Sequence, residues 1–345
     1  MDKAIGINME IKNLLNKITD RRDLTIKEAG FLLEQVINRQ LNPSQIAAVL
    51  AGLRTKEESV DEIVGFIQTM RKHITKVHAP KAIDIVGTGG DGTGTFNIST
   101  TASFVVAGCG VKIAKHGNRA TSSKCGSADV LEALGVNINL TKDQAEKVFE
   151  KIGIVFLYAP SFHPAMKQIA PIRKELGIRT IFNFLGPFLN PAGTKKQLLG
   201  VPNVRIAEKL AKVAAKLKFT HLLLVTSEDK MDEITTTTKT KIFEIKGSDV
   251  RSYTISPKQF GIKFATIQEL MGGSAGKNST IVKNILQGKK GSKRDIVVLN
   301  SAAALYLAGK AKNITNGILL AEKSIDEGLA KSVLQKLIIE TNKYA

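Results

Sequence analysis

The sequence contains no tryptophan and only four tyrosines among its 345 residues. Proteins that bind single-stranded nucleic acids usually stack bases on aromatic side chains, and this chain offers few such platforms. Its two cysteines, Cys109 and Cys125, are too few for a disulfide framework and lack the spacing of metal ligands. No apolar run approaches the ~20 residues that span a bilayer, and the first residues lack the apolar core of a secretion signal. These absences predict a reduced protein of the cytoplasm.

Acidic residues are also scarce, because 31 Asp and Glu face 50 Lys and Arg and leave a net charge of +19. A strongly basic chain raises the possibility of a nucleic-acid partner or a polyanionic substrate. The basic residues are scattered over the faces of predicted helices and form no block, so we interpret most of them as solvated surface lysines. The charge by itself leaves these alternatives open.

The hydrophobic pattern divides the chain into two kinds of segment. The first 75 residues have the apolar spacing of helix faces, and Asn42 followed by proline is typical of a helix start. From about residue 80, short β-branched runs alternate with helical patterns, which indicates an α/β domain with a mostly parallel sheet. Ser127 is expected to cap one of these helices. Another helical segment, 164–177, interrupts the α/β region, and its place in the chain does not say which domain it packs on.

The densest motif is a glycine-rich loop, DIVGTGGDGTGTFNIST, at residues 84–100. A short strand leads into the loop, and a helix is expected to start at Ser99. Glycines let backbone N–H groups approach phosphate oxygens, while a helix N-terminus adds donors and a favourable dipole. Hydroxyl and amide side chains in the loop add neutral donors. We therefore interpret it as a phosphate-binding loop and not as a flexible surface turn.

Two nucleotide-binding motifs are matched only in part. The loop contains G-x-G-x-x-G, but the next strand ends in Lys115 and His116, where a dinucleotide site needs a carboxylate. Residues 272–279 resemble a Walker loop, but they are one residue short and have Asn where Ser or Thr should hold magnesium. The nicotinamide interpretation therefore fails, and 272–279 is expected to be a loop before a helix.

A second constellation is the basic segment KHGNRATSSKCGSAD, residues 115–129. It combines lysine, histidine and arginine with hydroxyl and amide donors, and it follows a predicted strand. Such a mixture could surround a pyrophosphate group. His116 taken alone could equally be a histidine held by packing. The segment as a whole contains so many small, neutral residues that an ordinary solvated surface does not explain it.

The third constellation is the acidic pair Asp232 and Glu233, just after the predicted strand HLLLV. Adjacent carboxylates point in different directions from one backbone, so they can serve two metal ions or one ion and its water shell. Magnesium keeps several waters and is typically shared between one or two carboxylates and substrate phosphates. A lone pair of this kind is usually a solvated surface pair. Its position after a strand, in a chain with two phosphate-type loops, favours a magnesium site.

Taken together, these motifs resemble those of the anthranilate phosphoribosyltransferases. The likeness extends over essentially the whole chain and is carried by six segments: NPSQIAAVLAGLR (42–54), GTGGDGTGTFNIST (87–100), KHGNRATSS (115–123), APIRKELGIRTIFNFLGPFLNPA (170–192), MDEIT (231–235) and RDIVVLNSAAALYLAGKA (294–311).

The resemblance implies an α/β plus all-α fold, in which a small helical domain packs against a larger α/β domain with a mostly parallel central sheet. It assigns residues 1–75 with about 163–190 to the helical domain, and 80–160 with about 195–345 to the catalytic domain. The active site would lie in the cleft between them. Members of this family are usually homodimers joined through their helical domains.

The resemblance also implies an activity of tryptophan biosynthesis, the transfer of phosphoribosyl from phosphoribosyl pyrophosphate (PRPP) to the amine of anthranilate, with Mg²⁺ as cofactor. The implied contacts to PRPP are Gly87, Gly90, Asp91, Thr95, Asn97, Ile98, Ser99, Thr100, Lys115, His116, Gly117, Asn118, Arg119, Ala120, Thr121, Ser122, Ser123 and Ser127. Those to anthranilate are Gly87, Asn118 and Arg173, with His116 near the acceptor, and those to the metal are Ser99, Asp232 and Glu233. A guanidinium fork suits the anthranilate carboxylate. No residue stands out as a general base, and none is needed for an amine that is already neutral.

The chain departs from the family's pattern beside the acidic pair. Where the family usually has His-Gly before the acidic stretch and Gly-Leu just ahead of Asp-Glu, this chain has Ser227-Glu228 and Lys230-Met231. The two metal carboxylates are intact, so the departure concerns loop conformation and rate more than identity.

Two rival functions remain open. A pyrimidine nucleoside phosphorylase shares the two-domain fold and a similar basic loop, but it would use inorganic phosphate and no magnesium pair. A non-catalytic relative that binds nucleic acid would suit the +19 charge, but it would not need intact glycine, basic and acidic motifs. We therefore expect no specific nucleic-acid partner and no membrane partner.

Overall fold

The structure is a computed structural model that describes residues 10–120 and 124–345. It contains two compact units, one formed by the described residues up to Ile74 together with His163–Leu189, the other by Thr75–Phe162 and Asn190–Ala345. The domain boundaries given above, and the independent folding of the two domains, remain predictions. In the described part of the chain, no helix is long and apolar enough to cross a membrane.

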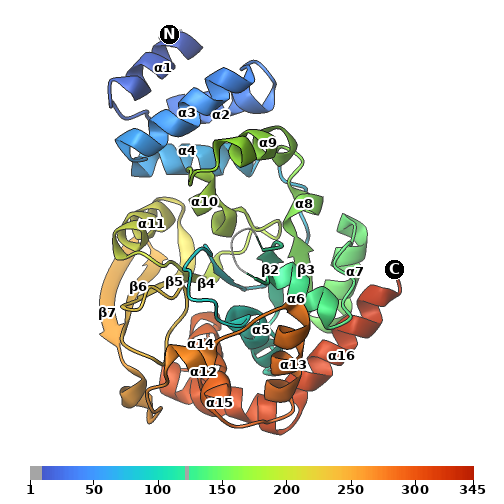
Figure 1. Cartoon of the computed structure of the whole chain (residues 1–345). Helices are drawn as coiled ribbons and strands as arrows, with labels where there is room; N and C mark the ends of the chain where they lie inside the picture. Colours follow the sequence, from blue (N-terminus) through green and yellow to red (C-terminus); the bar gives the residue numbers. More distant parts are fainter. Residues whose placement is uncertain (1–9, 121–123) are drawn as a thin grey trace, which may run out of the picture. The chain divides into compact units, whose positions relative to one another are not determined.

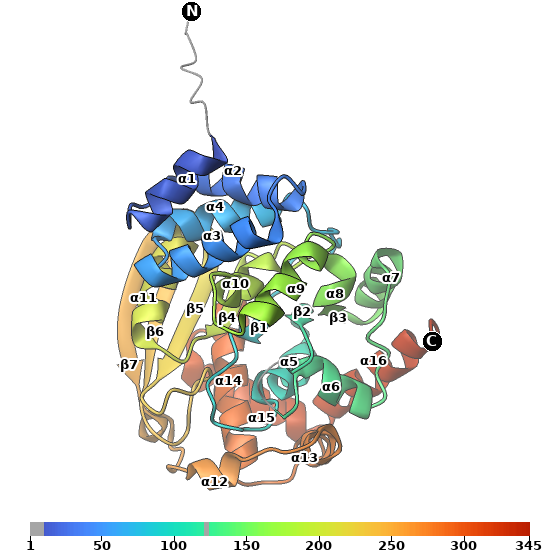
Figure 2. The same ribbon diagram turned by 45° about the horizontal axis from the view of Figure 1, so that its top comes forward.

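The first unit is helical (Figures 1 and 2). Its elements are α1 (Ile11–Thr19), α2 (Ile26–Ile37), α3 (Pro43–Lys56), α4 (Val60–Met70), α9 (Met166–Leu176), α10 (Phe182–Leu185) and the 3-10 helix η1 (Gly186–Leu189). Capping boxes at Thr25, Asn42 and Ser59 satisfy free N–H groups at the starts of α2, α3 and α4. Helix α9 packs on α3, and α10 packs on α4. The mid-chain helical segment, whose packing the sequence left open, therefore belongs with the first four helices.

Where the structure describes it, the second unit is built on seven strands: β1 (Asp84–Gly87), β2 (Ile113–Gly117), β3 (Ile154–Tyr158), β4 (Lys196–Gly200), β5 (Phe219–Ser227), β6 (Thr240–Gly247) and β7 (Asp249–Ile255). One sheet has the order β1-β4-β5-β6-β7, and β2 pairs with β3. The pairs β1–β4, β4–β5 and β2–β3 are parallel, whereas β5–β6 and β6–β7 are antiparallel. The predicted fold class is confirmed. The β6–β7 hairpin was not anticipated, since β7 is exposed at most positions and gives little apolar signal.

Helices surround these strands (Figure 2). They are α5 (Ile98–Gly108), α6 (Ser127–Ala133), α7 (Lys142–Ile152), α8 (Ala159–Phe162), α11 (Val204–Lys216), α12 (Ile267–Leu270), α13 (Ala275–Leu286), α14 (Ser292–Ala308), α15 (Ile314–Asp326), α16 (Leu329–Asn342) and the 3-10 helix η2 (Pro257–Phe260). Helix α5 is buried on nearly all sides, since it packs on β1, β2, α14 and α16. Its N-terminus follows the glycine loop directly, so the core helix fixes the end of that loop.

Two local predictions need correction. Helix α5 begins at Ile98, one residue before the predicted Ser99. Ser127 is not the cap of α6 but its first residue. The cap position is Gly126, whose N–H donates to the Asp129 carboxylate at 2.8 Å. The prediction that 272–279 forms a loop before a helix holds only for the first three residues, because Ser274 caps α13 and residues 275–279 already belong to that helix.

Candidate active site

The glycine loop and the acidic loop are bound to each other at the carboxyl ends of β1, β4 and β5. The backbone N–H of Gly89 donates to Asp232 Oδ2 at 2.8 Å, and Gly89 has φ +68°. A Cβ on Gly87 would overlap the Asp232 carboxylate, so only glycine fits there. At the start of α5, the N–H of Ser99 donates to Glu233 Oε1 at 3.0 Å. The two predicted motifs therefore form one site, as the adjacent carboxylates bind different parts of the glycine loop.

Both carboxylates of the pair lie in an environment that disfavours their charge. Burial, followed by the charges of Asp91 and Glu233, raises the pKa of Asp232 well above its usual value. Burial raises the pKa of Glu233 to about 7, against hydrogen bonds from Ser99 and the charge of Lys115. The surroundings compensate these two like charges only in part. A bound cation would therefore stabilise the ionised pair.

The pair is open to further ligands. In the described residues, no group of three or more His, Cys, Asp or Glu could enclose a metal ion. Magnesium commonly completes its coordination with waters and substrate oxygens. The donor set therefore fits a cation that is shared with a phosphorylated ligand.

Lys115 is a buried cation behind this site. Its Nζ donates to the carbonyl of Ile85 at 2.6 Å. Burial lowers the pKa of Lys115, while the charges of Asp84, Glu233 and Asp232 oppose that shift. The positive charge predicted at the end of β2 is thus directed back toward the acidic pair.

Asp84 and Asn190 were missed by sequence reasoning, although they hold β2 in place. Asp84 Oδ1 accepts the N–H of His116 at 3.3 Å, and Asp84 Oδ2 accepts Asn190 Nδ2 at 2.8 Å. Asn190 also donates to the carbonyl of Ala114 at 2.8 Å. Burial raises the pKa of Asp84 to about 6, against the charge of Lys115. The sequence signal that could have identified Asp84 is a carboxylate at the first position of an otherwise apolar strand.

The basic segment is only partly directed toward a ligand. Arg119 makes two hydrogen bonds to Glu132, at 2.5 and 2.8 Å, and a third to Asp129 at 3.2 Å. Its guanidinium also lies over the ring of Tyr158. Arg119 is therefore engaged within the protein, and its predicted PRPP contact stays a prediction.

The rest of the segment is mostly used for local structure. The carbonyl of Asn118 accepts Ser127 Oγ at 3.2 Å, and a Cβ on Gly117 would overlap that hydroxyl. The N–H of Ala120 donates to Asp129 at 2.9 Å. Residues 121–123, Thr121, Ser122 and Ser123, lie outside the described residues. The turn between β2 and α6 is thus fixed at both ends of that gap.

The predicted ligands in the second half of the glycine loop also have structural partners. Asn97 accepts from Asn278 Nδ2 at 2.9 Å and donates to the carbonyl of Cys125 at 3.2 Å, which ties the glycine loop to α13 and the basic segment. Thr95 forms an isolated antiparallel bridge with Met271. Ile98 and Thr100 are buried, whereas Gly90 is exposed and Asp91 accepts from the hydroxyl of Thr93. Gly90 is therefore the most accessible of these predicted ligands.

The unusual residues beside the acidic pair have clear roles. Ser227 Oγ donates to the carbonyl of Glu233 at 2.7 Å, and Met231 is fully buried. Lys230 has φ +66°, a left-handed conformation at a position where the family usually has glycine. Asn300 of α14, another residue missed from the sequence, accepts the N–H of Ile234 at 3.0 Å and donates to its carbonyl at 2.8 Å. Hydrogen bonds from Ser227 and Asn300 therefore hold the loop around the acidic pair, although its sequence departs from the family's pattern.

Arg173 lies on α9 of the helical unit, and the contacts that follow are to residues of the same unit. Its guanidinium carbon is 5.5 Å from the ring centroid of Phe182, and its Nη2 donates to Asn183 Oδ1 at 3.4 Å. The Nε atom is buried without a hydrogen-bond partner among the described residues. Burial lowers the pKa of Arg173, and a carboxylate ligand would satisfy the unused donor.

Comparisons with known proteins agree with this arrangement. Residues 12–74 match the helical bundle domain of a glycosyl transferase family, and residues 79–331 match the α/β domain of that family. The chain is 46% identical over 330 residues to the anthranilate phosphoribosyltransferase of Pelotomaculum thermopropionicum, covering 95% of this chain and 96% of that one. It is 47% identical over 349 residues to that of Geobacter sulfurreducens, covering 96% and 100%. The chain belongs to the anthranilate phosphoribosyltransferase family.

Solved structures of anthranilate phosphoribosyltransferases are similar over nearly the whole chain. The enzyme from Thermus thermophilus has a TM-score of 0.89 at 35% identity, covering 95% of this chain and 99% of that one. The enzyme from Saccharomyces cerevisiae in complex with PRPP and Mg also has a TM-score of 0.89, at 28% identity, covering 97% and 99%. The family and fold implied by the sequence motifs are thereby confirmed.

Proposed function

We propose that this chain transfers the phosphoribosyl group of PRPP to the amine of anthranilate and releases pyrophosphate, with Mg²⁺ bound at Asp232 and Glu233. The observation that carries the proposal is the pairing of the phosphate loop with the acidic pair, through Gly89 to Asp232 and Ser99 to Glu233. A dinucleotide site would have no use for two buried carboxylates behind its glycine loop. The family relationship supports the same activity.

Magnesium fits the donor chemistry of the site, and when bound it would neutralise charge on the pyrophosphate leaving group. The chain's own groups act in the same direction. The N-terminus of α5 at the end of the glycine loop favours negative charge at the carboxyl edge of the strands. Lys115 adds a fixed positive charge behind the pair. Stabilisation of the departing pyrophosphate is therefore the main contribution that we assign to this unit.

We assign the binding of the acceptor, anthranilate, to Arg173. Its stacked guanidinium has an unused donor, which suits the planar carboxylate of anthranilate. The aromatic amine is neutral at pH 7 and can attack ribose C1 without a strong base, so positioning supplies most of the acceleration. The role of general base stays empty. The other ligands inferred from the family motifs, including Gly90, Asp91 and Asn118, remain part of the proposal.

Two further features extend the proposal by analogy with the family. We expect the chain to work as a homodimer in the cytoplasm. Size-exclusion chromatography with light scattering would test the dimer, because a monomeric mass at assay concentrations would contradict it.

The function is tested by following the loss of anthranilate fluorescence in a buffer with PRPP and Mg²⁺. Turnover that requires all three components would support the proposal. Phosphorolysis of a pyrimidine nucleoside by inorganic phosphate, without anthranilate turnover, would identify the phosphorylase alternative. Absence of both reactions, with tight DNA binding that survives moderate salt, would identify the nucleic-acid-binding alternative.

A further inference from the structure

A second basic site lies at the opposite edge of the strands of the α/β unit. A cavity of about 710 Å³ is lined by residues that precede or begin β1, β2, β4 and β5. The acidic pair and the glycine loop follow the carboxyl ends of these strands, whereas this cavity is at their amino ends. Since parallel strands keep their two ends at opposite edges, the cavity is separate from the site of the proposed transfer reaction.

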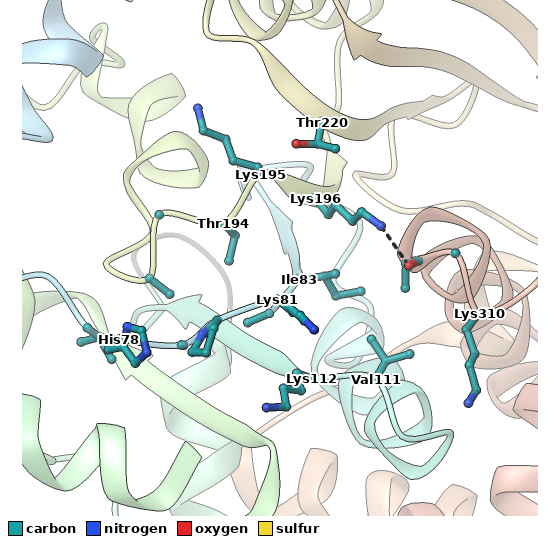
Figure 3. Close-up of a pocket in the computed structure, with 18 of the residues that line it drawn as sticks. His78, Lys81, Ile83, Val111, Lys112, Thr194, Lys195, Lys196, Thr220 and Lys310 are labelled. Atoms are coloured by element: carbon teal, nitrogen blue, oxygen red, sulfur yellow. Dashed lines mark hydrogen bonds between the residues drawn. The ribbon is translucent and has the colours of Figure 1, made fainter. Parts of the chain in front are cut away.

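The lining of this cavity is strongly basic. It includes Lys81, Lys112, Lys195, Lys196, Lys310 and His78, and none of the described residues that line it is Asp or Glu. In the described part of the chain, Lys81, Lys112 and Lys310 have no carboxylate within ion-pair distance and are exposed. Figure 3 shows Lys81, Lys112 and Lys310 on three different segments that line the pocket, with their side chains extending in different directions. Like charges from separate segments repel one another unless an anion lies between them.

Part of this charge has a structural explanation. The Nζ of Lys196 donates to the carbonyl of Ala308 at 3.0 Å, the contact drawn in Figure 3, and that of Lys195 donates to the carbonyl of Leu217 at 3.0 Å. These carbonyls are at the C-terminal ends of α14 and α11, where cations are favourable. Lys112 lies over the ring of Phe149. Helix ends therefore account for Lys195 and Lys196, and Lys310 directly follows the C-cap of α14, whereas no helix end accounts for Lys81.

Two features oppose an anion here. The C-terminal ends of α5 and α14 both reach the cavity, and each carries a partial negative charge of about half an elementary charge. The carboxylate of Glu146 accepts the N–H of His78 at 2.7 Å and so lies nearby. Five lysines exceed these charges, so the net field at the cavity still favours an anion.

We propose that this cavity binds a small polyanion that carries two or more phosphate groups. Its volume is in the range of small-molecule sites, roughly 300–1,000 Å³. The lysines surround a hollow and do not form a track along the surface, which suits a compact ligand better than a nucleic-acid strand. No Phe or Tyr is among the described residues that line it, so bases would find no stacking platform.

The test uses inorganic tripolyphosphate as the probe, titrated calorimetrically into the full chain without magnesium. The pocket variant is Lys81→Glu with Lys310→Glu. The control variant is Lys331→Glu with Lys336→Glu, which changes the net charge equally at two exposed lysines of α16 outside the cavity. None of the four lysines belongs to the proposed active site.

We expect the pocket variant to bind tripolyphosphate at least about tenfold more weakly than the parent, because two attractive charges become repulsive. The control variant should lose much less, and both variants should keep the parental KM for PRPP. The last measurement separates this cavity from the catalytic edge, which also binds phosphate groups under the proposed function. A chain without transferase activity could still bind tripolyphosphate here, so the two proposals can fail separately.

Three outcomes would overturn the proposal. The first is equal weakening in the control variant, which would mean that net charge alone attracts the probe. The second is unchanged tripolyphosphate binding in the pocket variant. The third is a short single-stranded DNA that binds more tightly than tripolyphosphate and is lost in the pocket variant, which would assign the lysines to nucleic acid.

Discussion

The two edges of the parallel strands hold their charges in opposite ways. At the carboxyl edge, Lys115 is buried with Asp84, Asp232 and Glu233 as charged neighbours, and the pKa values of all four are shifted. At the amino edge, Lys81 and Lys310 are exposed, and neither has a carboxylate partner among the described residues.

The difference teaches that the same residue type can be a fixed part of the structure or a free surface charge. A buried ion loses its hydration, so it is retained only where partners compensate, and removing one partner is costly. An exposed lysine keeps its hydration and can change with little effect on stability. Substitutions at the two edges should therefore differ in their effects on activity and stability.

The largest effect is expected at the acidic pair. Asp232→Ala with Glu233→Ala should lower turnover at least about a hundredfold, since groups that stabilise developing charge contribute effects of this size. The melting temperature should not fall much, because both carboxylates are disfavoured by burial in the absence of a cation. Turnover is measured against magnesium concentration. Glu228→Ala, an exposed carboxylate in the same loop, is the control, and a double variant with normal magnesium dependence would contradict the assignment.

The second effect is on stability. Asp84→Asn should lower the free energy of unfolding by about 1–3 kcal/mol at pH 7, because one amide oxygen cannot accept from both the N–H of His116 and Asn190 Nδ2. Urea denaturation measures the loss, and Lys310→Met at the amino edge should be nearly neutral. A loss below about 1 kcal/mol would mean that the two hydrogen bonds of the Asp84 carboxylate contribute little to stability.

Arg173 gives a third setting, a half-buried cation in the helical unit. Arg173→Ala should weaken the use of anthranilate by about 1.5–3 kcal/mol, or ten- to a hundredfold, with much less effect on PRPP. Steady-state kinetics with each substrate varied in turn measures the two effects. Lys174→Ala, an exposed neighbour on α9, is the control. Equal losses for both substrates would show that Arg173 supports the site generally and does not bind the carboxylate.

Glu244 tests the contrast through pH. Burial raises the pKa of Glu244, but hydrogen bonds from Lys246, Tyr306 and His221 outweigh it and lower the pKa from 4.5 to about 2. Since the folded pKa is depressed, its stabilisation is complete above pH 4.5 and disappears as the pH falls toward 2. Glu244→Gln should therefore lose about 1–3 kcal/mol at neutral pH and approach the parent in acid.

Melting curves between neutral and acid pH would measure this difference. Glu327→Gln provides the comparison, because Glu327 forms only an exposed pair with Lys323 at 3.8 Å. A gap between the parent and Glu244→Gln that stays constant down to pH 2 would contradict the assigned pKa.

The smallest effect concerns backbone conformation, which does not depend on charge. Lys230 near the acidic pair and Lys218 at the amino end of β5 have φ +66° and +53°. Replacing either by glycine relieves about 1–2 kcal/mol of left-handed strain but adds about 0.5–1 kcal/mol of chain entropy. Each change should therefore stabilise the protein by about 0.5 kcal/mol, measured by urea denaturation. A loss of stability for Lys230→Gly alone would mean that its side chain matters to the acidic loop.

Much of the candidate site could be predicted from the sequence because its proposed ligands are concentrated in short segments. The glycine loop, the basic segment and the acidic pair are each continuous, so composition and strand position were enough to indicate phosphate and metal chemistry. Asp84, Asn190 and Asn300 were missed because each is a single polar residue in an apolar surrounding. Their partners lie 32, 106 and 66 residues away, and no local pattern reveals such distant hydrogen bonds.

Periodicity in the sequence indicated the α/β and helical segments, because it is a local property. The resemblance of short continuous motifs indicated the family and the segments proposed to bind phosphate and metal. Only the tertiary structure decided which atoms meet. It paired Gly89 with Asp232 and Ser99 with Glu233, turned Arg119 toward Glu132, and gathered lysines from distant segments at the amino edge. The reason is that burial and ion pairing depend on distances in space, which strand order and packing set and which separation along the chain does not.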